Sequence, residues 1–192
     1  MTWVVVLVKD FDTAKQRLSP ALEPAARRRL AIANAERAIR AAAGVGQVLV
    51  VAGSSEAARL AEALGAESHL EREPSGQNPA AAAGIGLVRE RGAEAVLVLS
   101  SDLPRVTRSA LKAVAGAAGD RSPVAVAAAA IGRGGTNALF LRPPDAIGLH
   151  FGDQSLRKFE ADARGKDVPF EILDHPQLAL DLDEPADLLV AP

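Results

Sequence analysis

Three aspartates stand at points where apolar segments of the chain end. Asp102 follows the apolar run Val96–Leu99, and Asp181 and Asp183 follow the shorter run Leu178–Leu180. In an extended segment, residues two apart project to the same side, so the last two carboxylates can face one point. Mg²⁺ takes carboxylate oxygens, usually together with the phosphates of a substrate. We therefore predict that the three aspartates form a magnesium site for phosphate chemistry.

A charged segment, Lys9–Pro20, follows the first apolar run of the chain and carries Lys15 and Arg17. Cationic side chains in such a loop can hold phosphate oxygens and balance charge as a phosphoryl bond breaks. The segment lacks the glycines of a Walker A sequence. We predict that Lys15 and Arg17 contact phosphate.

Two segments of small residues later in the chain could bind an anion. Gly132–Asn137 combines glycines with the hydroxyl of Thr136, and such a turn can expose backbone N–H groups. Gly152 and Ser155 stand where a helix is expected to begin, and the amino termini of helices attract anions. Glycine-rich turns are common, so each segment also fits a plain turn.

The acidic and basic candidates have structural alternatives as well. Asp102 could simply cap a turn, and Asp183 could cap a short helix that Pro185 opens, with Asp181 in solvent. The segment Lys9–Pro20 could be an ordinary solvated loop. Two acidic strand ends in one chain without cysteine favour the metal site over these alternatives.

The elements that would position these residues follow an alternating order. The run at 96–99 is apolar at successive positions, which is typical of a strand buried on both faces of a parallel sheet. In open α/β sheets ligands bind at the carboxyl ends of the strands, so Asp102 lies where a site is expected. Further strands are expected over 1–8, 47–52, 67–70, 124–131, 138–141 and 170–173, and helices over 24–43, 55–64, 79–92, 107–118, 154–164 and after 183. The alternation predicts an α/β fold with a mostly parallel sheet covered by helices on both faces.

Composition limits the class of protein further. The 192 residues suffice for one full core, so we expect a single domain over residues 1–192. The net charge of -2 and the pI of about 5.9 provide no general attraction for nucleic acid or an anionic membrane. The chain has no cysteine, which excludes thiolate metal sites and cysteine nucleophiles. The apolar segment Met1–Val8 lacks a basic leader and is too short to span a bilayer, so we expect a first strand and a cytoplasmic protein.

Five motifs occur in order along the chain, in the segments Lys9–Ser19, Ser101–Pro104, Gly135–Leu139, Phe151–Ser155 and Leu180–Leu188. Together they resemble the motifs of the phospholactate (or phosphoenolpyruvate) guanylyltransferases, which make the GDP-activated intermediate in the biosynthesis of coenzyme F-420. The similarity runs over nearly the whole chain. Single motifs such as Asp-Leu-Pro are unspecific, whereas five at matching spacing are fairly specific.

The resemblance implies a fold and a metal site. The fold would be a nucleotidyltransferase fold of the nucleotide-diphospho-sugar transferase type, a three-layer α/β/α sandwich with a mixed, mainly parallel sheet. By the same resemblance, Asp102, Asp181 and Asp183 would hold Mg²⁺, and Lys15 would contact phosphate.

The resemblance also implies substrate contacts. Thr136, Gly152 and Ser155 would receive the carboxylate and phosphate of the acid, and Asn78 falls in the loop on the nucleotide side. The expected partners are GTP and a phosphorylated small acid, with a homodimer possible and with no nucleic acid or membrane.

Four positions depart from the pattern of the family. Gln77 replaces the usual leucine of the nucleotide-side loop, and Arg105 follows Asp-Leu-Pro where an apolar residue is frequent. Phe159 replaces a common histidine, and Gln16 follows Lys15 where a small residue is more usual. These positions bear on the choice of base and acceptor and leave the expected fold unchanged.

The expected reaction is transfer of a guanylyl group from GTP to the phosphate of phosphoenolpyruvate or 2-phospho-L-lactate, with release of pyrophosphate. The acceptor is already an anion, so no strong general base is needed. Catalysis would come from aligning two anions and neutralising their repulsion. The alternatives are another nucleotidyltransferase of the same fold, of the cytidylyl- or sugar-1-phosphate type, and a non-catalytic nucleotide-binding member.

Overall fold

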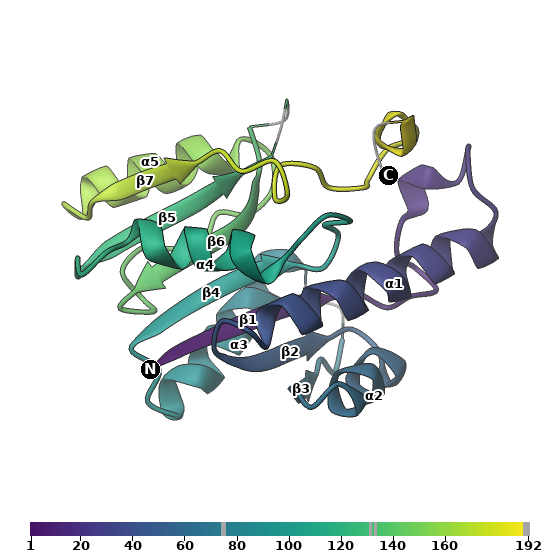
Figure 1. The fold of residues 1–192 in the computed structure, drawn as a ribbon, viewed down its shortest axis with the longest axis horizontal. Helices are drawn as coiled ribbons and strands as arrows, with labels where there is room; N and C mark the ends of the chain where they lie inside the picture. Colours follow the sequence, from purple (N-terminus) through teal and green to yellow (C-terminus); the bar gives the residue numbers. More distant parts are fainter. Residues whose placement is uncertain (74–75, 131, 133, 190–192) are drawn as a thin grey trace.

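The computed structural model describes residues 1–192 except 74–75, 131, 133 and 190–192. Within the described residues, seven strands form one sheet in the order β3-β2-β1-β4-β6-β5-β7 (Figure 1). The strands are β1 (Thr2–Val8), β2 (Gln47–Ala52), β3 (Glu67–Leu70), β4 (Ala95–Ser100), β5 (Val124–Ala129), β6 (Thr136–Arg142) and β7 (Phe170–Leu173). The helices are α1 (Pro24–Ala42), α2 (Ser55–Ala63), α3 (Gln77–Glu90), α4 (Arg108–Ala117) and α5 (Ser155–Gly165), with 3-10 helices η1 (Gln16–Leu18) and η2 (Pro185–Leu189).

The sheet is mixed and mainly parallel, as expected. Strand β6 runs antiparallel to β4 and β5, whereas the other neighbouring strands pair in parallel. From β1 the chain adds β2 and then β3 on one side, and it returns to place β4 on the other side of β1. The strand order therefore reverses between β1 and β4, and ligands of open α/β sheets bind at the carboxyl ends of strands beside such a reversal.

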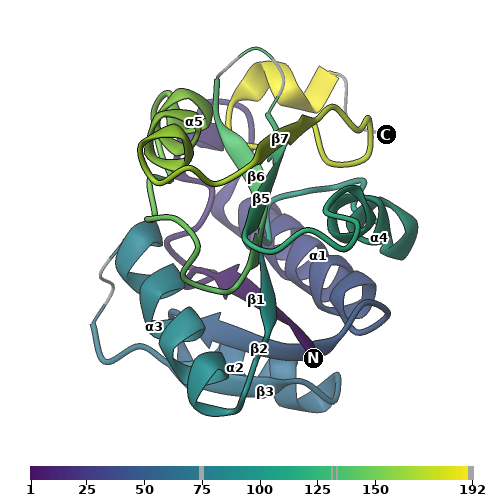
Figure 2. The same cartoon turned by 90° about the vertical axis from the view of Figure 1, so that its left-hand side faces the viewer.

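Helices cover both faces of the sheet, which confirms the three layers (Figure 2). Alternate residues of β1 point to opposite faces. Val4 and Val6 pack in one cluster with residues of α1, α2 and α4, and Trp3 and Val5 pack in a second cluster with residues of α3 and α5. The strands are thus buried on both sides, which explains their unbroken apolar runs.

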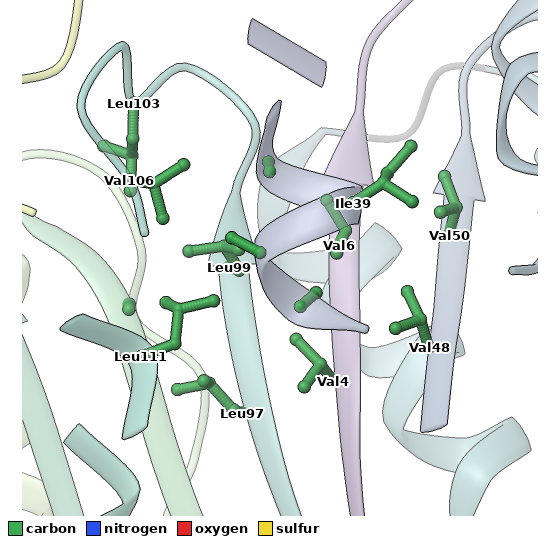
Figure 3. Packing of buried hydrophobic residues seen from close by; sticks show 14 of the residues in the cluster. Val4, Val6, Ile39, Val48, Val50, Leu97, Leu99, Leu103, Val106 and Leu111 are labelled. Carbon is green, nitrogen blue, oxygen red and sulfur yellow. The ribbon is translucent and has the colours of Figure 1, made fainter. Parts of the chain in front are cut away.

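The larger of these clusters fixes the centre of the sheet against α1. Val6 of β1 and Leu97 and Leu99 of β4 belong to this cluster; Ile39 of α1 lies beside Val6, and Leu111 of α4 lies near Leu97 (Figure 3). Each of these five side chains is at most 1% exposed. Full burial of such a side chain contributes about 1.5–3 kcal/mol. Strands β1 and β4, which end at the predicted site, are therefore held at the centre of the sheet by this burial.

Most expected element boundaries are close to the observed ones. The side chains of Ser54 and Thr107 accept hydrogen bonds from backbone N–H groups at the starts of α2 and α4, as expected for cap residues. Helix α3 begins at Gln77, two residues before Pro79. Strand β5 ends at Ala129, and position 131 of the expected strand lies outside the described residues. None of the helices in the described part of the chain has the length and apolarity that crossing a membrane requires.

Candidate active site

A cavity of about 580 Å³ opens at the carboxyl ends of β1, β2 and β4. The first residue of β6, Thr136, belongs to the same edge because β6 runs antiparallel to β4. Six predicted site residues line this cavity: Arg17, Asp102, Thr136, Gly152, Asp181 and Asp183. The other three, Lys15, Asn78 and Ser155, lie outside the cavity lining and bind residues that belong to it or adjoin it.

Lys15 lies behind Asp102 rather than in the cavity. Its ammonium group contacts Asp102 Oδ1 at 2.6 Å and donates a hydrogen bond to the carbonyl oxygen of Leu182 at 2.6 Å. The Lys15 side chain is 1% exposed, and its backbone has a φ of 61° in the left-handed region. A buried charge needs such partners to be tolerated. Lys15 therefore joins the loop after β1, the end of β4 and the C-terminal segment.

The C-terminal segment that carries Asp181 and Asp183 is fixed to the sheet by backbone hydrogen bonds. The N–H of Leu182 donates to the Asp102 carbonyl oxygen at 3.1 Å, and the Leu182 side chain is 2% exposed. Asp181 and Asp183, on either side of this buried residue, both line the cavity. Figure 1 shows the yellow segment running across the top of the sheet toward the purple loop after β1. Both aspartates therefore border the same cavity, and the expected common orientation of their carboxylates stays a prediction.

Asp187, a residue of η2, holds the two residues that precede this short helix. Its Oδ2 atom accepts hydrogen bonds from the N–H groups of Asp183 and Glu184, at 2.9 and 2.7 Å, just before η2. The Asp183 carboxylate contacts Arg17, with 2.7 Å between Nη1 and Oδ2. Arg17 is 70% exposed, and exposed ion pairs contribute only about 0–1 kcal/mol. An incoming phosphate can therefore take over Arg17 at small energetic cost.

Asn137 is a site residue that the sequence did not single out. It lines the cavity beside Thr136, is 5% exposed, and donates through Nδ2 to the carbonyl oxygen of Leu178 at 2.8 Å. Asn137 thereby anchors the start of the segment that bears the two C-terminal aspartates. An amide in an otherwise apolar strand was the available signal, because a buried amide requires a hydrogen-bond partner.

A magnesium ion fits the donor chemistry of this wall. Asp102, Asp181 and Asp183 offer hard oxygen atoms, and the ion pairs of Asp102 and Asp183 each use one oxygen of a group that has two. The described residues contain no group of three or more Asp, Glu, His or Cys side chains arranged to hold a metal by themselves. Mg²⁺ often has only one or two protein carboxylates and takes the rest of its ligands from substrate phosphates and water. Its binding by these aspartates stays a prediction.

The two small-residue segments meet at the other end of the cavity. The hydroxyl of Ser155, the first residue of α5, donates to Thr136 Oγ1 at 3.0 Å, and both side chains are buried. Gly152 has a φ of 118°, a conformation that favours glycine. The N–H of Leu156 donates to the carbonyl oxygen of Gly134 at 3.1 Å, which fixes the amino end of α5 beside β6. This end of the cavity is polar, with Thr136, Gly152 and the acidic residue Asp153 in its lining beside the amino end of α5. Binding of the acid here stays a prediction.

Asn78 acts on a loop rather than on the cavity directly. Its Nδ2 donates to the Phe151 carbonyl oxygen at 2.9 Å, and its Oδ1 accepts from the Phe151 N–H at 2.7 Å. This double hydrogen bond holds the residue before Gly152 against the start of α3. The neighbour Gln77 lines the cavity. Asn78 is therefore placed to position the loop that carries Gly152, and its expected role on the nucleotide side stays a prediction.

Two of the other departures from the motif pattern are Phe159, which is buried, and Arg105, which is exposed. Phe159 is fully buried, with its ring at 5.2 Å from the ring of Phe151 and at 5.6 Å from that of His150. Its ring packs against that of Phe151 and so supports the loop that carries Gly152. Arg105 is exposed and is not part of the cavity lining.

Comparisons with known proteins agree with this arrangement. A family model described as "Guanylyl transferase CofC like" matches residues 2–191. A phosphoenolpyruvate guanylyltransferase of Rubrobacter xylanophilus is 37% identical over 188 residues, which cover 97% of this chain and 91% of the relative. A 3-phospho-D-glycerate guanylyltransferase of Phenylobacterium zucineum is 32% identical, over 97% of this chain and 88% of the relative.

Solved structures support the fold. A putative nucleotide-diphospho-sugar transferase from Desulfovibrio desulfuricans G20 superposes with a TM-score of 0.81 at 15% identity, over 98% of this chain and 85% of that chain. A nucleotidyl transferase from Methanothermobacter has a TM-score of 0.69 at 16% identity, over 99% of this chain and 95% of that chain. The expected nucleotidyltransferase type of fold is thereby confirmed.

Proposed function

Since this chain belongs to the family of CofC-like guanylyl transferases, we propose that it transfers a guanylyl group from GTP to phosphoenolpyruvate or 2-phospho-L-lactate and releases pyrophosphate. Members of this family are nucleotidyltransferases, so the chain is an enzyme. The observation that carries the proposal is the cavity beside the strand reversal, whose lining includes Asp102, Asp181 and Asp183, the cation Arg17 and, at one end, Thr136 and Gly152.

The reaction needs no proton transfer to begin. A phosphate oxygen of the acceptor attacks the α-phosphorus of GTP and forms a new P–O bond. The bond between the α-phosphorus and the oxygen bridging to the β-phosphate breaks, and its electron pair leaves with pyrophosphate. Two like-charged groups must approach each other, which is unfavourable unless nearby cations reduce the repulsion. The enzyme's task is therefore alignment and charge compensation.

The residues of the cavity divide this task. Arg17 exchanges Asp183 for a phosphate oxygen and brings a positive charge to the triphosphate. Thr136 and the amino end of α5 orient the acceptor anion at the polar end of the cavity, where the glycine at 152 leaves room close to the backbone. Lys15 holds Asp102 in place from behind the wall.

Magnesium completes the proposal. Asp102, Asp181 and Asp183 are the residues that would hold it, and when bound it supplies positive charge against the phosphates. The carboxylates are kept at the cavity wall by Lys15, Arg17 and the backbone of Leu182.

Related guanylyltransferases differ in the phosphorylated acid that accepts the guanylyl group. Phosphoenolpyruvate is favoured because the relatives at 37 and 35% identity carry the name phosphoenolpyruvate guanylyltransferase. A second candidate is 3-phospho-D-glycerate, which the name of the relative from Phenylobacterium supports. A role in the biosynthesis of coenzyme F-420 in the cytoplasm belongs to the same proposal and follows if the product is the GDP-linked phospholactate or phosphoenolpyruvate.

The test is a matrix of substrates with mass detection of the product. The purified protein is incubated with Mg²⁺, with each of the four nucleoside triphosphates, and with each of the three acids and a sugar 1-phosphate in turn. The proposal predicts pyrophosphate release and a GDP-linked acid with GTP and phosphoenolpyruvate or 2-phospho-L-lactate. A product with CTP, or with a sugar 1-phosphate as acceptor, would establish the alternative nucleotidyltransferase activity. Absence of any product would contradict the proposal.

A further inference from the structure

The cavity extends along the sheet edge, and its two ends differ in chemistry. One end, beside β6, has the polar recess of Thr136 and Gly152. The other end lies beside β2 and β3 and is lined by Val51, Gly53, Glu71, Gly76, Gln77 and Ala80. With strands about 4.8 Å apart, the four spacings from β3 to β6 amount to roughly 19 Å. An extended nucleotide with an acceptor at its α-phosphate can occupy this length.

The end beside β3 has the character of a base site. The side chains of Val51 and Ala80 are buried and Leu7 is half-buried, so the floor is apolar there. A flat heterocycle gains from an apolar floor with a few polar groups at its rim. Arg17 follows β1 and the predicted metal ligand Asp102 follows β4, the two strands that lie between this floor and the recess beside β6. The base then projects toward β2 and β3.

Glu71 stands at the rim of this floor in a fixed position. It follows β3 directly, and its N–H donates to the Ala52 carbonyl oxygen at the end of β2, at 2.9 Å. Its side chain is half-buried and lines the cavity. It is the acidic side chain of the lining that lies farthest toward β3, away from the three aspartates of the metal prediction.

We propose that Glu71 selects guanine, by accepting hydrogen bonds from N1–H and the N2 amino group of the base; this inference rests on the proposed function. Guanine presents those two donors side by side, and a carboxylate accepts two parallel hydrogen bonds. Adenine presents an unprotonated N1 beside its amino group, so its lone pair would face the carboxylate. Cytosine likewise presents N3 as an acceptor, and uracil offers a single N–H between two carbonyl oxygens.

The carboxylate therefore faces a lone pair in adenine and cytosine and gains only one hydrogen bond from uracil, so guanine alone satisfies both of its oxygens. A buried acceptor left without its donor costs binding energy, which is why sites built around hydrogen bonds reject analogues strongly. An amide in place of the carboxylate would present one acceptor and one donor, and that pair matches the amino group and N1 of adenine. The change Glu71→Gln should therefore shift preference from guanine toward adenine.

The experiment compares kcat/KM for GTP, ITP and ATP in the wild type and in Glu71→Gln. ITP lacks the N2 amino group and so tests one of the two hydrogen bonds alone. We expect the wild type to prefer GTP to ITP by about tenfold or more, since a hydrogen bond to a charged group is being lost. We expect the GTP-to-ATP ratio of kcat/KM to fall about 100-fold in Glu71→Gln. Glu73→Gln is the matched control, because Glu73 is exposed, lies two residues away and is not part of the cavity lining.

The outcomes separate this inference from the proposed function. A wild type that makes no guanylyl product contradicts the proposed function. A wild type that uses GTP, with an unchanged GTP-to-ATP ratio in Glu71→Gln, overturns the assignment of Glu71 and leaves the function intact. An equal fall in the ratio for Glu73→Gln would also overturn it, because a general charge effect would then explain the change. If Glu71→Gln does not fold, Glu71→Ala serves instead, and loss of discrimination between GTP and ITP is the expected result.

Discussion

The ammonium group of Lys15 is held between the Asp102 carboxylate and the Leu182 carbonyl oxygen, with almost no exposure to solvent. The sequence indicated a cation after the first strand and suggested a phosphate contact. The left-handed backbone at Lys15 turns its side chain to the interior instead, and no pattern of residue types encodes that orientation. Of the two cations predicted to contact phosphate, Lys15 and Arg17, only Arg17 lines the cavity.

Replacing Lys15 with methionine tests its positioning role. Lys15→Met leaves the Asp102 carboxylate, 26% exposed, without its cation, and we expect a loss of about 2–3 kcal/mol in the free energy of unfolding. The double variant Lys15→Met with Asp102→Asn should recover part of that loss, because no unpaired charge remains. Urea unfolding monitored by circular dichroism measures both. A Lys15→Met protein of normal stability with only a raised KM for GTP would instead indicate a phosphate contact.

Arg17 should behave in the opposite way. Because its pair with Asp183 is exposed, Arg17→Gln should change the free energy of unfolding by less than about 1 kcal/mol. Loss of a cation at the triphosphate should raise the KM for GTP by about tenfold or more. Steady-state kinetics with varied GTP checks this, with Arg89→Gln as the control, since Arg89 has an exposed pair with Asp145 outside the cavity. Equal kinetic effects of the two changes would contradict a phosphate role for Arg17.

At the element scale, the positions of strands and helices were largely predictable. Residue periodicity and caps such as Ser54 and Thr107 are local signals, and local signals set where elements begin and end. The direction of β6 was not predictable from its own residues, since an apolar run such as 138–141 fits either direction. That direction matters for function, because it brings Thr136 to the same edge as Asp102.

The link between α3 and the loop that carries Gly152 yields a prediction at this scale. Asn78→Ala removes both hydrogen bonds to Phe151 and should lower the free energy of unfolding by about 1–2 kcal/mol. Because the freed loop carries Gly152, the KM for the acid should rise about tenfold, while the KM for GTP changes little. Asn78→Asp keeps the acceptor for the Phe151 N–H but places a carboxylate oxygen opposite the Phe151 carbonyl oxygen, so it should not restore wild-type stability. A larger effect on the KM for GTP than on that for the acid would show that Asn78 serves the nucleotide.

At the scale of the whole molecule, the site depends on contacts between segments far apart in the sequence. Asp102 meets Lys15 and Leu182 across long stretches of chain, and residue types alone contain little information about such contacts. The expectation that the three aspartates share one cavity came from their common position after apolar segments and from the resemblance to a family. The anchoring by Asn137 was missed because it depends on which segment crosses the end of β6.

The measurement that tests the account most directly is guanylyl transfer by Asp102→Asn. With GTP, Mg²⁺ and phosphoenolpyruvate, we expect turnover to fall about 1,000-fold or more, because the carboxylate at the centre of the wall is lost. Circular dichroism should show a retained fold, and Asp145→Asn, outside the cavity, should keep normal turnover. A folded Asp102→Asn protein that transfers the guanylyl group at a near-normal rate would contradict the assignment of this cavity as the active site.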